Sequence, residues 1–285
     1  MLSHPGRSKP NQRATRKAER VNYTSEGTLS GRFCESHREK PLLGEPRRSQ
    51  ERAKGALVLV ERIVAPYFAT NCWIISTGSG NECVIVDPGI AVPDLAFRII
   101  EQCQRLKVKP VAILITHGHL DHTYSVFPLA EEGGVSTAYI HPDDRELLIN
   151  PAKGLGVQGL ALLEQLAPTK KWHEPDRVVE VDDAHVIEVA GMDIEVLHAP
   201  GHTRGSVMYR VDGSTLMSGD VLFKGAIGRT DLPTGSPRAM KISLSEKVLT
   251  LPDDVRVLPG HGDETTIGLE RISNPYLLEI SSSSR

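Results

Sequence analysis

The sequence predicts an α/β protein in which two β-sheets are covered by helices. Apolar, β-branched runs of strand length recur in two stretches of the chain, residues 56–140 and 178–258. Segments with the 3.6-residue apolar period of amphipathic helices lie among these runs. Because a sheet must bury an apolar face against another layer, this alternation favours two sheets with helices packed on them.

A basic leader, residues 1–55, precedes both stretches. It holds 13 Lys and Arg against 6 Asp and Glu, whereas residues 56–285 hold 20 basic and 30 acidic residues. Its Pro, Gly, Ser and Arg content cannot close a core, so we expect a disordered leader, such as an over-extended translation start would add. No apolar segment follows its early positive charges, which argues against a secretory signal peptide. An organelle transit peptide and a nucleic-acid-binding arm are the alternatives.

The folded domain, residues 56–285, is expected to begin with an antiparallel meander. Its three strands are residues 56–64, 71–76 and 84–86, separated by turn signals. Residues 93–107 repeat apolar side chains every three to four positions and predict a helix.

Shorter elements complete this half of the domain. Strands are expected at residues 111–115 and 137–140, with helices at residues 125–132 and 143–149, the second capped by Asp residues. Residues 151–177 show no clean period, so we expect a loop with a short helix. A loop of this kind near a functional site often shapes the substrate pocket.

The second half resumes strand patterning. Strands are expected at residues 178–181, 185–189, 192–198, 207–211, 215–218 and 255–258. Asp212-Gly213 is a hairpin turn signal between two of these strands. A helix is expected at residues 237–250 and a last one near Glu270.

Composition narrows the class of protein. The apolar runs are too short to span a bilayer, and the four cysteines have neither CxxC spacing nor a disulfide-dense pattern. Both features favour a cytoplasmic protein without a membrane partner. The acidic domain argues against a nucleic-acid partner, because it offers no phosphate-tracking surface. We expect a monomer or homodimer.

One short segment concentrates residues that bind metals. The strand at residues 111–115 runs directly into His117, His119, Asp121 and His122. Side chains two apart in an extended segment point the same way, so His117 and His119 can converge on one ion. Asp121 and His122 fall in the turn beyond, where they can face a second ion.

Three further polar residues follow apparent strand ends. His202, Asp220 and His261 each come after an apolar strand and a glycine, which lets the backbone approach a site closely. Together with the segment above they make five histidines and two aspartates. This set suits zinc, iron or manganese. Seven ligands are too many for one tetrahedral ion and fit two ions that share a carboxylate.

At these residues the sequence resembles the metallo-β-lactamase superfamily. The resemblance spans about residues 57–275 and rests on four motifs: Thr116-His-Gly-His-Leu-Asp-His122, Pro200-Gly-His-Thr-Arg-Gly-Ser206, Ser218-Gly-Asp220 and Pro259-Gly-His261. It implies a four-layer αβ/βα sandwich with two metals, zinc being favoured, at one edge between the sheets.

The resemblance also assigns the ligands. By motif, the first metal takes His117, His119 and His202; the second takes Asp121, His122 and His261; and Asp220 bridges them. Asp121 and Asp220 are expected to be catalytic residues as well as ligands. Asp87, at the end of a strand, resembles a superfamily position that supports the site.

Three features indicate a branch of the superfamily. The position that supplies a cysteine ligand in many secreted lactamases is Asp220 here, and no export signal is evident, so an antibiotic-degrading lactamase is disfavoured. Residues 223–233 look like a segment of glyoxalase II-like thioester hydrolases and of persulfide dioxygenases. The chain ends soon after His261, without the C-terminal helical domain of glyoxalase II proper, so it is more similar to short glyoxalase II-like proteins.

The resemblance therefore implies a hydrolase of S-2-hydroxyacyl thioesters such as S-lactoylglutathione, as in methylglyoxal detoxification. Two metals would supply hydroxide near neutral pH, and Asp121 would orient it. Arg229, and with it Lys224, would bind the anionic end of the substrate, unless Asp231 instead holds Arg229. A thiolate leaves without protonation, because the pKa of a thiol is about 8.5.

Two other activities remain open. A persulfide dioxygenase has the same fold and segment but binds one iron through two histidines and an aspartate. A metallo-nuclease or other phosphoesterase would give the basic leader a role in binding nucleic acid. Metal content and activity towards thioesters separate these possibilities.

Overall fold

A computed structural model describes residues 59–78, 80–167 and 170–283. These residues belong to one compact unit, Arg52–Arg285. The leader expected at residues 1–55, and residues 56–58 of the first expected strand, lie outside the described residues.

The first sheet contains six strands in the order β1-β2-β3-β4-β5-β6. The first three form the predicted antiparallel meander, and β3, β4, β5 and β6 run parallel to one another. The strands are β1 Leu59–Val64, β2 Asn71–Ser76, β3 Glu82–Val86, β4 Lys109–Leu114, β5 Thr137–Ile140 and β6 Arg177–Glu180.

The second sheet also contains six strands, in the order β14-β13-β10-β9-β8-β7. They are β7 Val186–Val189, β8 Met192–His198, β9 Val207–Val211, β10 Thr215–Gly219, β13 Arg256–Pro259 and β14 Thr265–Thr266. The predicted hairpin joins β9 to β10, and β10 pairs in parallel with β13. Two short strands, β11 Leu222–Phe223 and β12 Ala226–Ile227, form a separate ribbon.

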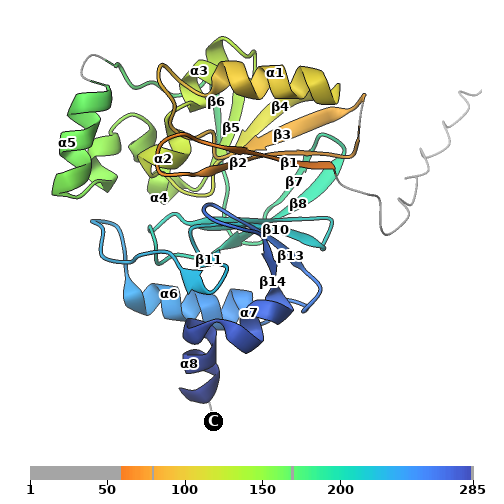
Figure 1. Ribbon diagram of the computed structural model, residues 1–285, viewed down its shortest axis with the longest axis vertical. Helices are drawn as coiled ribbons and strands as arrows, with labels where there is room; N and C mark the ends of the chain where they lie inside the picture. The colour runs from red at the N-terminus through yellow and green to blue at the C-terminus, as the bar shows by residue number, and fades with distance from the viewer. Residues whose placement is uncertain (1–58, 79, 168–169, 284–285) are drawn as a thin grey trace, which may run out of the picture. The chain divides into compact units, whose positions relative to one another are not determined.

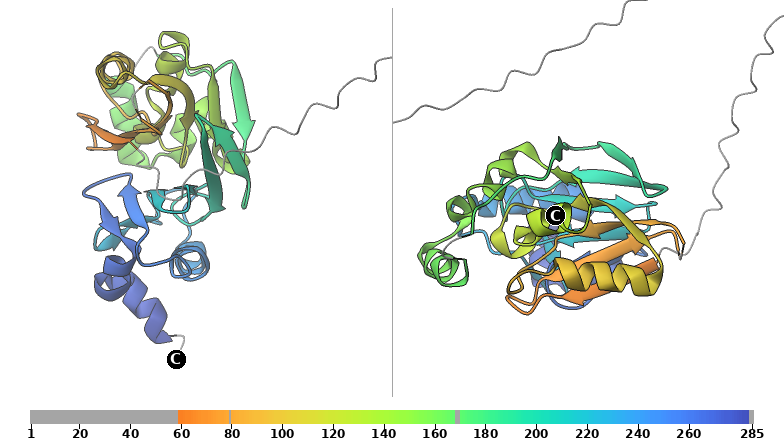
Figure 2. Two further views of the ribbon diagram at one scale, coloured as in Figure 1. Left: turned by 90° about the vertical axis from the view of Figure 1, so that its right-hand side faces the viewer. Right: turned by 90° about the horizontal axis from the view of Figure 1, so that it is seen from above.

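Helices cover the outer faces of both sheets, which gives the expected αβ/βα layering (Figures 1 and 2). Helices α1 (Ala96–Leu106) and α3 (Val126–Glu131) lie on the first sheet. Helices α6 (Pro237–Ser243) and α7 (Ile267–Ser273) lie on the second sheet, and α8 (Pro275–Ser283) packs against α7 below them in Figure 1. The remaining helices are α2 Leu120–Thr123, α4 Pro142–Arg145 and α5 Val157–Leu166, with short helical segments η1 Glu146–Leu148, η2 Pro151–Gly154 and η3 Leu244–Val248.

The core is divided by the two sheets into three apolar layers. Trp73, Val196 and Tyr209 belong to the cluster between the sheets, which is almost fully buried. A second cluster joins the first sheet to α1 and α3, and a third joins the second sheet to α6, α7 and α8. Burial of this much apolar surface is the main stabilising contribution to the fold and fixes the sheets that carry the strand ends.

The structure corrects two local expectations. The helix expected at residues 143–149 is α4 followed by η1, and His141, not an aspartate, caps it by accepting the Asp143 N–H through Nδ1. The reason is Pro142, which takes the first helical position and so makes residue 141 the cap. The helix near Glu270 is α7, but α8 follows it. Within the described residues, no helix is both long and apolar enough to cross a membrane.

Candidate metal centre

The predicted ligands come together at one edge of the two sheets. His117 and His119 lie in the loop after β4, and Asp121 and His122 lie in α2. Three loops of the second sheet supply the other ligands: His202 follows β8, Asp220 follows β10 and His261 follows β13. Since β10 and β13 run parallel, their carboxyl ends deliver side chains to the same edge.

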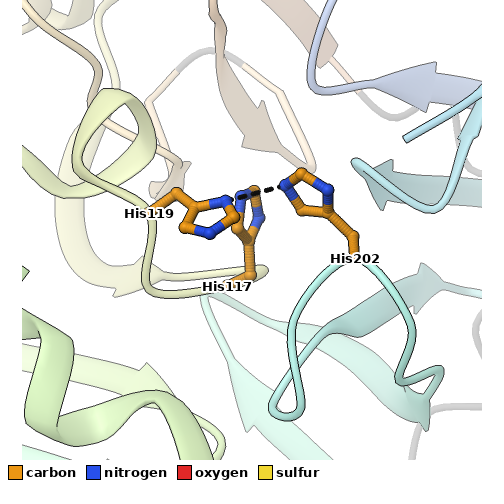
Figure 3. Close-up of side chains that lie close together, drawn as sticks. All are labelled: His117, His119 and His202. Carbon is orange, nitrogen blue, oxygen red and sulfur yellow. Dashed lines mark hydrogen bonds between the residues drawn. The ribbon is translucent and has the colours of Figure 1, made fainter. Parts of the chain in front are cut away.

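The first triad is His117, His119 and His202. Each ring offers a nitrogen, and the three nitrogens lie within 4.8 Å of one another. Figure 3 shows the rings of His117 and His119 rising from one loop to meet His202 from another. His119 Nδ1 lies 2.8 Å from His202 Nε2, a separation at which two nitrogens share one cation, either a proton or a metal.

The second triad is Asp121, His122 and His261. Oδ2 of Asp121 lies 3.5 Å from His122 Nε2 and 3.3 Å from His261 Nε2. The two Nε2 atoms are 3.2 Å apart. This triad therefore presents one carboxylate and two imidazoles to a common point.

Asp220 lies between the triads. Its Oδ1 is 3.4 Å from His122 Nε2, while its Oδ2 is 3.5 Å from both His202 Nε2 and His261 Nε2. One carboxylate thus reaches nitrogens of both triads, which is the placement that the bridging assignment requires.

Hydrogen bonds on the outer side of three rings fix which nitrogen faces the centre. Nδ1 of His202 donates to the Arg229 carbonyl at 2.7 Å, and Nδ1 of His261 donates to the Phe68 carbonyl at 3.1 Å. Because a carbonyl only accepts, the proton must be on Nδ1 and the lone pair of Nε2 points inward. In His122, Nδ1 lies 2.9 Å from an Asp87 carboxylate oxygen, which accepts its proton and leaves Nε2 facing the centre.

The donor set fits divalent metal ions. Burial and the neighbouring imidazoles hold the pKa of His117 well below its usual value, and the same causes lower the pKa of His119 to about 3. Both rings are neutral at physiological pH, as metal ligands must be. Within the described residues, four buried side-chain atoms have no hydrogen-bond partner: Nε2 of His117, Nε2 of His119, Oδ1 of Asp220 and, outside the centre, Oγ1 of Thr234. Buried polar atoms are otherwise nearly always paired, so a bound cation accounts for Nε2 of His117 and Oδ1 of Asp220.

The second triad has a strongly negative environment. Burial would lower the pKa of His122, but the carboxylates of Asp121, Asp220 and Asp87 raise it to about 10. Burial would raise the pKa of Asp121, yet the imidazoles of His122 and His261 hold it far below its usual range. Groups that favour their charged forms so strongly mark a place that stabilises a cation.

Asp87 supports the centre, as the sequence suggested. It is buried, and its carboxylate accepts the Thr116 N–H at 2.8 Å and the Thr116 hydroxyl at 2.7 Å, besides its contact with His122. It therefore fixes both the start of the His117 loop and one ring of the second triad.

Asp144 is a supporting residue that the sequence did not reveal. Its fully buried carboxylate accepts the Gly118 N–H at 2.8 Å, the Gly205 N–H at 2.9 Å and the Thr203 hydroxyl at 2.6 Å. It thus joins the loop of His117 and His119 to the loop of His202. Nothing in the pattern distinguishes Asp144 from the exposed Asp143 beside it, because the partners are 26 or more residues away.

The three glycines that precede ligands serve different contacts. A Cβ on Gly260 would lie 2.2 Å from Asp220 Oδ1 and 2.8 Å from His122 Cε1, so this glycine does approach the centre. A Cβ on Gly201 would instead meet the Met240 backbone at 2.4 Å, and one on Gly219 would meet Thr116 Oγ1 at 2.5 Å. Only the first packs directly on the predicted ligands.

A cavity of about 1010 Å³ opens beside the centre. Arg229 lines it, and both Nε and Nη2 of this side chain donate to Asp231 at 2.7 Å. Lys224 is not among the lining residues; its side chain is 60% exposed and its Nζ lies 3.6 Å from Asp263. The cavity walls are otherwise formed by five of the predicted ligands and by apolar residues: Phe68, Ile90, His119, Leu120, Asp121, Leu155, Gly156, Val157, Gly159, His202, Asp220, Phe223, Leu232, Pro233 and His261, together with Asp231.

Another group of metal-binding side chains lies apart from this centre. His141 and His198 stack at a centroid distance of 4.1 Å, and His141 Nε2 lies 3.6 Å from Asp182. Because His141 Nδ1 accepts the Asp143 N–H, the proton of the neutral ring is on Nε2, which faces the Asp182 carboxylate and has no lone pair for a metal. His141 therefore has a structural role as the cap of α4.

Known proteins are similar to this chain in sequence and in fold. The hydroxyacylglutathione hydrolase GloC of Haemophilus influenzae is 33% identical over 219 residues, which cover 76% of this chain and 97% of that protein. The crystal structure of the B3 metallo-β-lactamase BLEG-1 is similar at 32% identity and a TM-score of 0.65, covering 77% of this chain and 99% of that one. The structure of TTHA1623 in a di-iron-bound form is similar at 32% identity and a TM-score of 0.62, covering 76% and 100%.

The family model described as the metallo-β-lactamase superfamily matches residues 65–261. This range begins in the meander and ends at the last predicted ligand, so it includes both triads and the carboxylate between them. With the αβ/βα layers and the edge placement of the centre, the match leads to one conclusion. The chain belongs to the metallo-β-lactamase superfamily.

Proposed function

We propose that this protein is a binuclear metal-dependent hydrolase of thioesters of low-molecular-weight thiols, with S-lactoylglutathione as the first substrate to test. The observation that carries the proposal is the position of Asp220, whose two oxygens reach nitrogens of both triads. A single mononuclear site would not need the second triad.

The residues would hold the metals as the motifs imply. His117, His119 and His202 take the first ion. The second ion takes Asp121, His122 and His261, and Asp220 is shared. Zinc is favoured, with iron and manganese as alternatives that suit the same imidazole and carboxylate donors. When bound, such ions supply Lewis acidity, which lowers the pKa of water towards neutrality and polarises a carbonyl.

Asp121 and Asp220 are the proposed catalytic residues. Asp121 is partly exposed to the cavity, and its carboxylate stays ionised because two imidazoles flank it. It can therefore accept a hydrogen bond from an attacking water and orient that water towards a bound carbonyl. The Thr70 hydroxyl donates to Asp121 Oδ2 at 3.3 Å and limits the rotation of the carboxylate.

A thioester suits a site built in this way. A thiolate leaves without a proton, because the pKa of a thiol is about 8.5, so no separate general acid is required. Arg229 lines the cavity and is proposed to contact the substrate; the proposed contact from Lys224 would require that side chain to leave Asp263. The name of the Haemophilus influenzae relative supports a hydroxyacyl thioester, and the di-iron form of TTHA1623 supports two metals.

The test is a direct assay of thiol release. The purified, metal-analysed protein is incubated with S-lactoylglutathione and with lactoyl thioesters of other small thiols, and free thiol is followed over time. Thiol release with about two metals per chain supports the proposal. No thiol release, together with one iron per chain and sulfite formed from a persulfide and oxygen, would instead identify a dioxygenase.

Because one similar structure is a B3 metallo-β-lactamase, a β-lactam is included as a competing substrate. A kcat/KM for the β-lactam above that for every thioester would overturn the proposed bond specificity. This comparison uses the same protein and the same metal load, so it tests the substrate alone.

A further inference from the structure

We propose that the cavity beside the metal centre accommodates an uncharged, apolar arm of the thioester and selects against anionic thiol carriers such as glutathione. This inference rests on the proposed thioester hydrolysis and adds the chemical class of the substrate. Three features of the cavity support it: one wall is apolar, the Arg229 side chain is paired with Asp231, and large apolar side chains are exposed at the rim.

The wall contributed by the segment around α5 is apolar and packs on a buried apolar cluster. Leu155 lines the cavity and also packs against the buried cluster of Ile90, Leu120 and Tyr124. Leu120 stands between two predicted ligands in the chain, so the wall is continuous with the metal centre. An arm attached to a carbonyl at the metals can therefore extend directly along it.

The opposite wall meets this one near the start of α5. Leu232 lies across from the start of α5, and a Cβ built on Gly156 would be 3.7 Å from Leu232 Cδ2. Gly156 and Gly159 both line the cavity and contribute no side chain to fill it. Leu232 and Pro233 therefore close the cavity with apolar side chains, and we call its apolar part, lined by Leu155, Val157, Leu232 and Pro233, the apolar channel.

Apart from the proposed metal ions, the described residues that line the cavity offer an anionic carrier no unpaired cation. Among the described residues that line it, Arg229 is the only lysine or arginine, and Asp231 already neutralises it through two hydrogen bonds. The predicted ligands Asp121 and Asp220 serve the metals. A glutathione arm brings two carboxylates and one ammonium, so at least one carboxylate would enter an apolar channel without a free cation.

The rim exposes large apolar side chains to solvent. Val157 is 85% exposed and Phe68 is 57% exposed, and both line the cavity. When a ligand covers exposed apolar side chains at the mouth of a cavity, their apolar surface is removed from water, which contributes favourable free energy to binding. Phe223, edge-on to His261 at 5.9 Å, extends this surface to the metal centre.

Two parts of a thioester can supply the apolar arm: the acyl group or the thiol. Two substrate series distinguish them. In the first, acyl groups of increasing length are carried by N-acetylcysteamine, a small neutral thiol. In the second, a lactoyl group is carried by neutral alkanethiols of increasing length. S-lactoylglutathione serves as the anionic reference.

We expect kcat/KM to rise about fourfold for each methylene added in one of the two series, until the cavity is filled. This factor is the gain from burying a methylene, converted to a rate ratio. The series that rises identifies the arm. Binding is measured separately by calorimetry with S-hexyl-N-acetylcysteamine and S-hexylglutathione, thioethers that cannot be hydrolysed, and the neutral one should bind more tightly.

Charge variants at Val157 test the same idea from the protein side. Val157→Lys should raise the ratio of kcat/KM for S-lactoylglutathione to that for the neutral thioesters by about two- to fivefold, the size of a surface charge pair. Val157→Asp should lower this ratio. The matched controls are Val186→Lys and Val186→Asp, since Val186 is 51% exposed on β7 and does not line the cavity.

The outcomes separate this inference from the proposed function. Thioester hydrolysis that is independent of chain length in both series, or that is faster with glutathione than with neutral carriers, overturns the inference and leaves the hydrolase. No thioester hydrolysis, but tighter calorimetric binding of the neutral thioether, overturns the hydrolase and supports the apolar channel. Equal binding of both thioethers contradicts the channel.

Discussion

Replacement of Asp144 by alanine should destabilise the fold and weaken the first triad. The substitution removes the acceptor for the Gly118 and Gly205 N–H groups and for the Thr203 hydroxyl. Thr203 retains a partner, because its hydroxyl lies 2.7 Å from Ser206 Oγ. The two N–H groups, by contrast, lose the only acceptor that the structure gives them.

The expected loss follows from those two donors. A buried donor left without a partner costs about 1–3 kcal/mol, so the free energy of unfolding should fall by about 2–6 kcal/mol. A typical domain is stable by about 5–15 kcal/mol, so the midpoint of urea unfolding should shift clearly. Asp144→Asn should lie between, because its carbonyl can still accept from Gly118 while its amide faces the Gly205 N–H.

The assay combines urea unfolding with metal competition. Asp143→Ala is the matched control, since this exposed neighbour lies in the same helix. In a chelator titration without urea, Asp144→Ala should begin to lose bound metal at a lower chelator concentration than the control. Unfolding and metal retention equal to those of the control would refute the role assigned to Asp144.

Two further predictions concern the centre, and a third concerns Lys170, whose Nζ donates to the Tyr124 carbonyl at 2.9 Å. Asp220→Ala should lose both metals together, measured by elemental analysis of the dialysed protein, and full retention would contradict a shared carboxylate. Gly260→Ala should displace Asp220, because the new Cβ would lie 2.2 Å from its Oδ1, and should lower kcat at least tenfold along with the metal content. Burial lowers the pKa of Lys170 to about 8 in the folded state, whereas an unfolded lysine has a pKa of about 10.4. Between these two pH values the unfolded state binds more protons, so the free energy of unfolding should rise between about pH 8 and pH 10.5. Urea unfolding at both pH values should show a smaller rise in the free energy of unfolding for Lys170→Met than for the unmodified protein. An equal rise in the two proteins would contradict the lowered pKa.

The sequence indicated the candidate ligands because their signals are local, and the structure brings these residues together. His117 and His119 are two residues apart after an apolar strand, and this spacing alone directs both rings to one side. The strand runs and turn signals also located most elements to within a few residues. The hairpin at Asp212-Gly213 is confirmed as the β9 to β10 connection.

Prediction was weaker where an element depends on distant contacts. The cap of α4 was assigned to aspartates because acidic residues favour helix starts, but Pro142 shifted the first turn by one residue. The short strand β14 carries too few residues to show a period and exists because β13 offers it an edge. The role of Asp144 depends on two loops that are distant from it in the sequence, so it leaves no local signal.

By itself, the sequence determined the alternation of strands and helices, the metal-binding residue types and their division into local groups. Only the tertiary structure decided that His119 meets His202, 83 residues away, and that one carboxylate lies between two triads. It also decided that Arg229 is neutralised by Asp231 and that the segment around α5 supplies an apolar wall. The physical reason is that ligand chemistry is a property of side chains, whereas a cavity and its charge balance arise from surfaces brought together by the packing of two sheets.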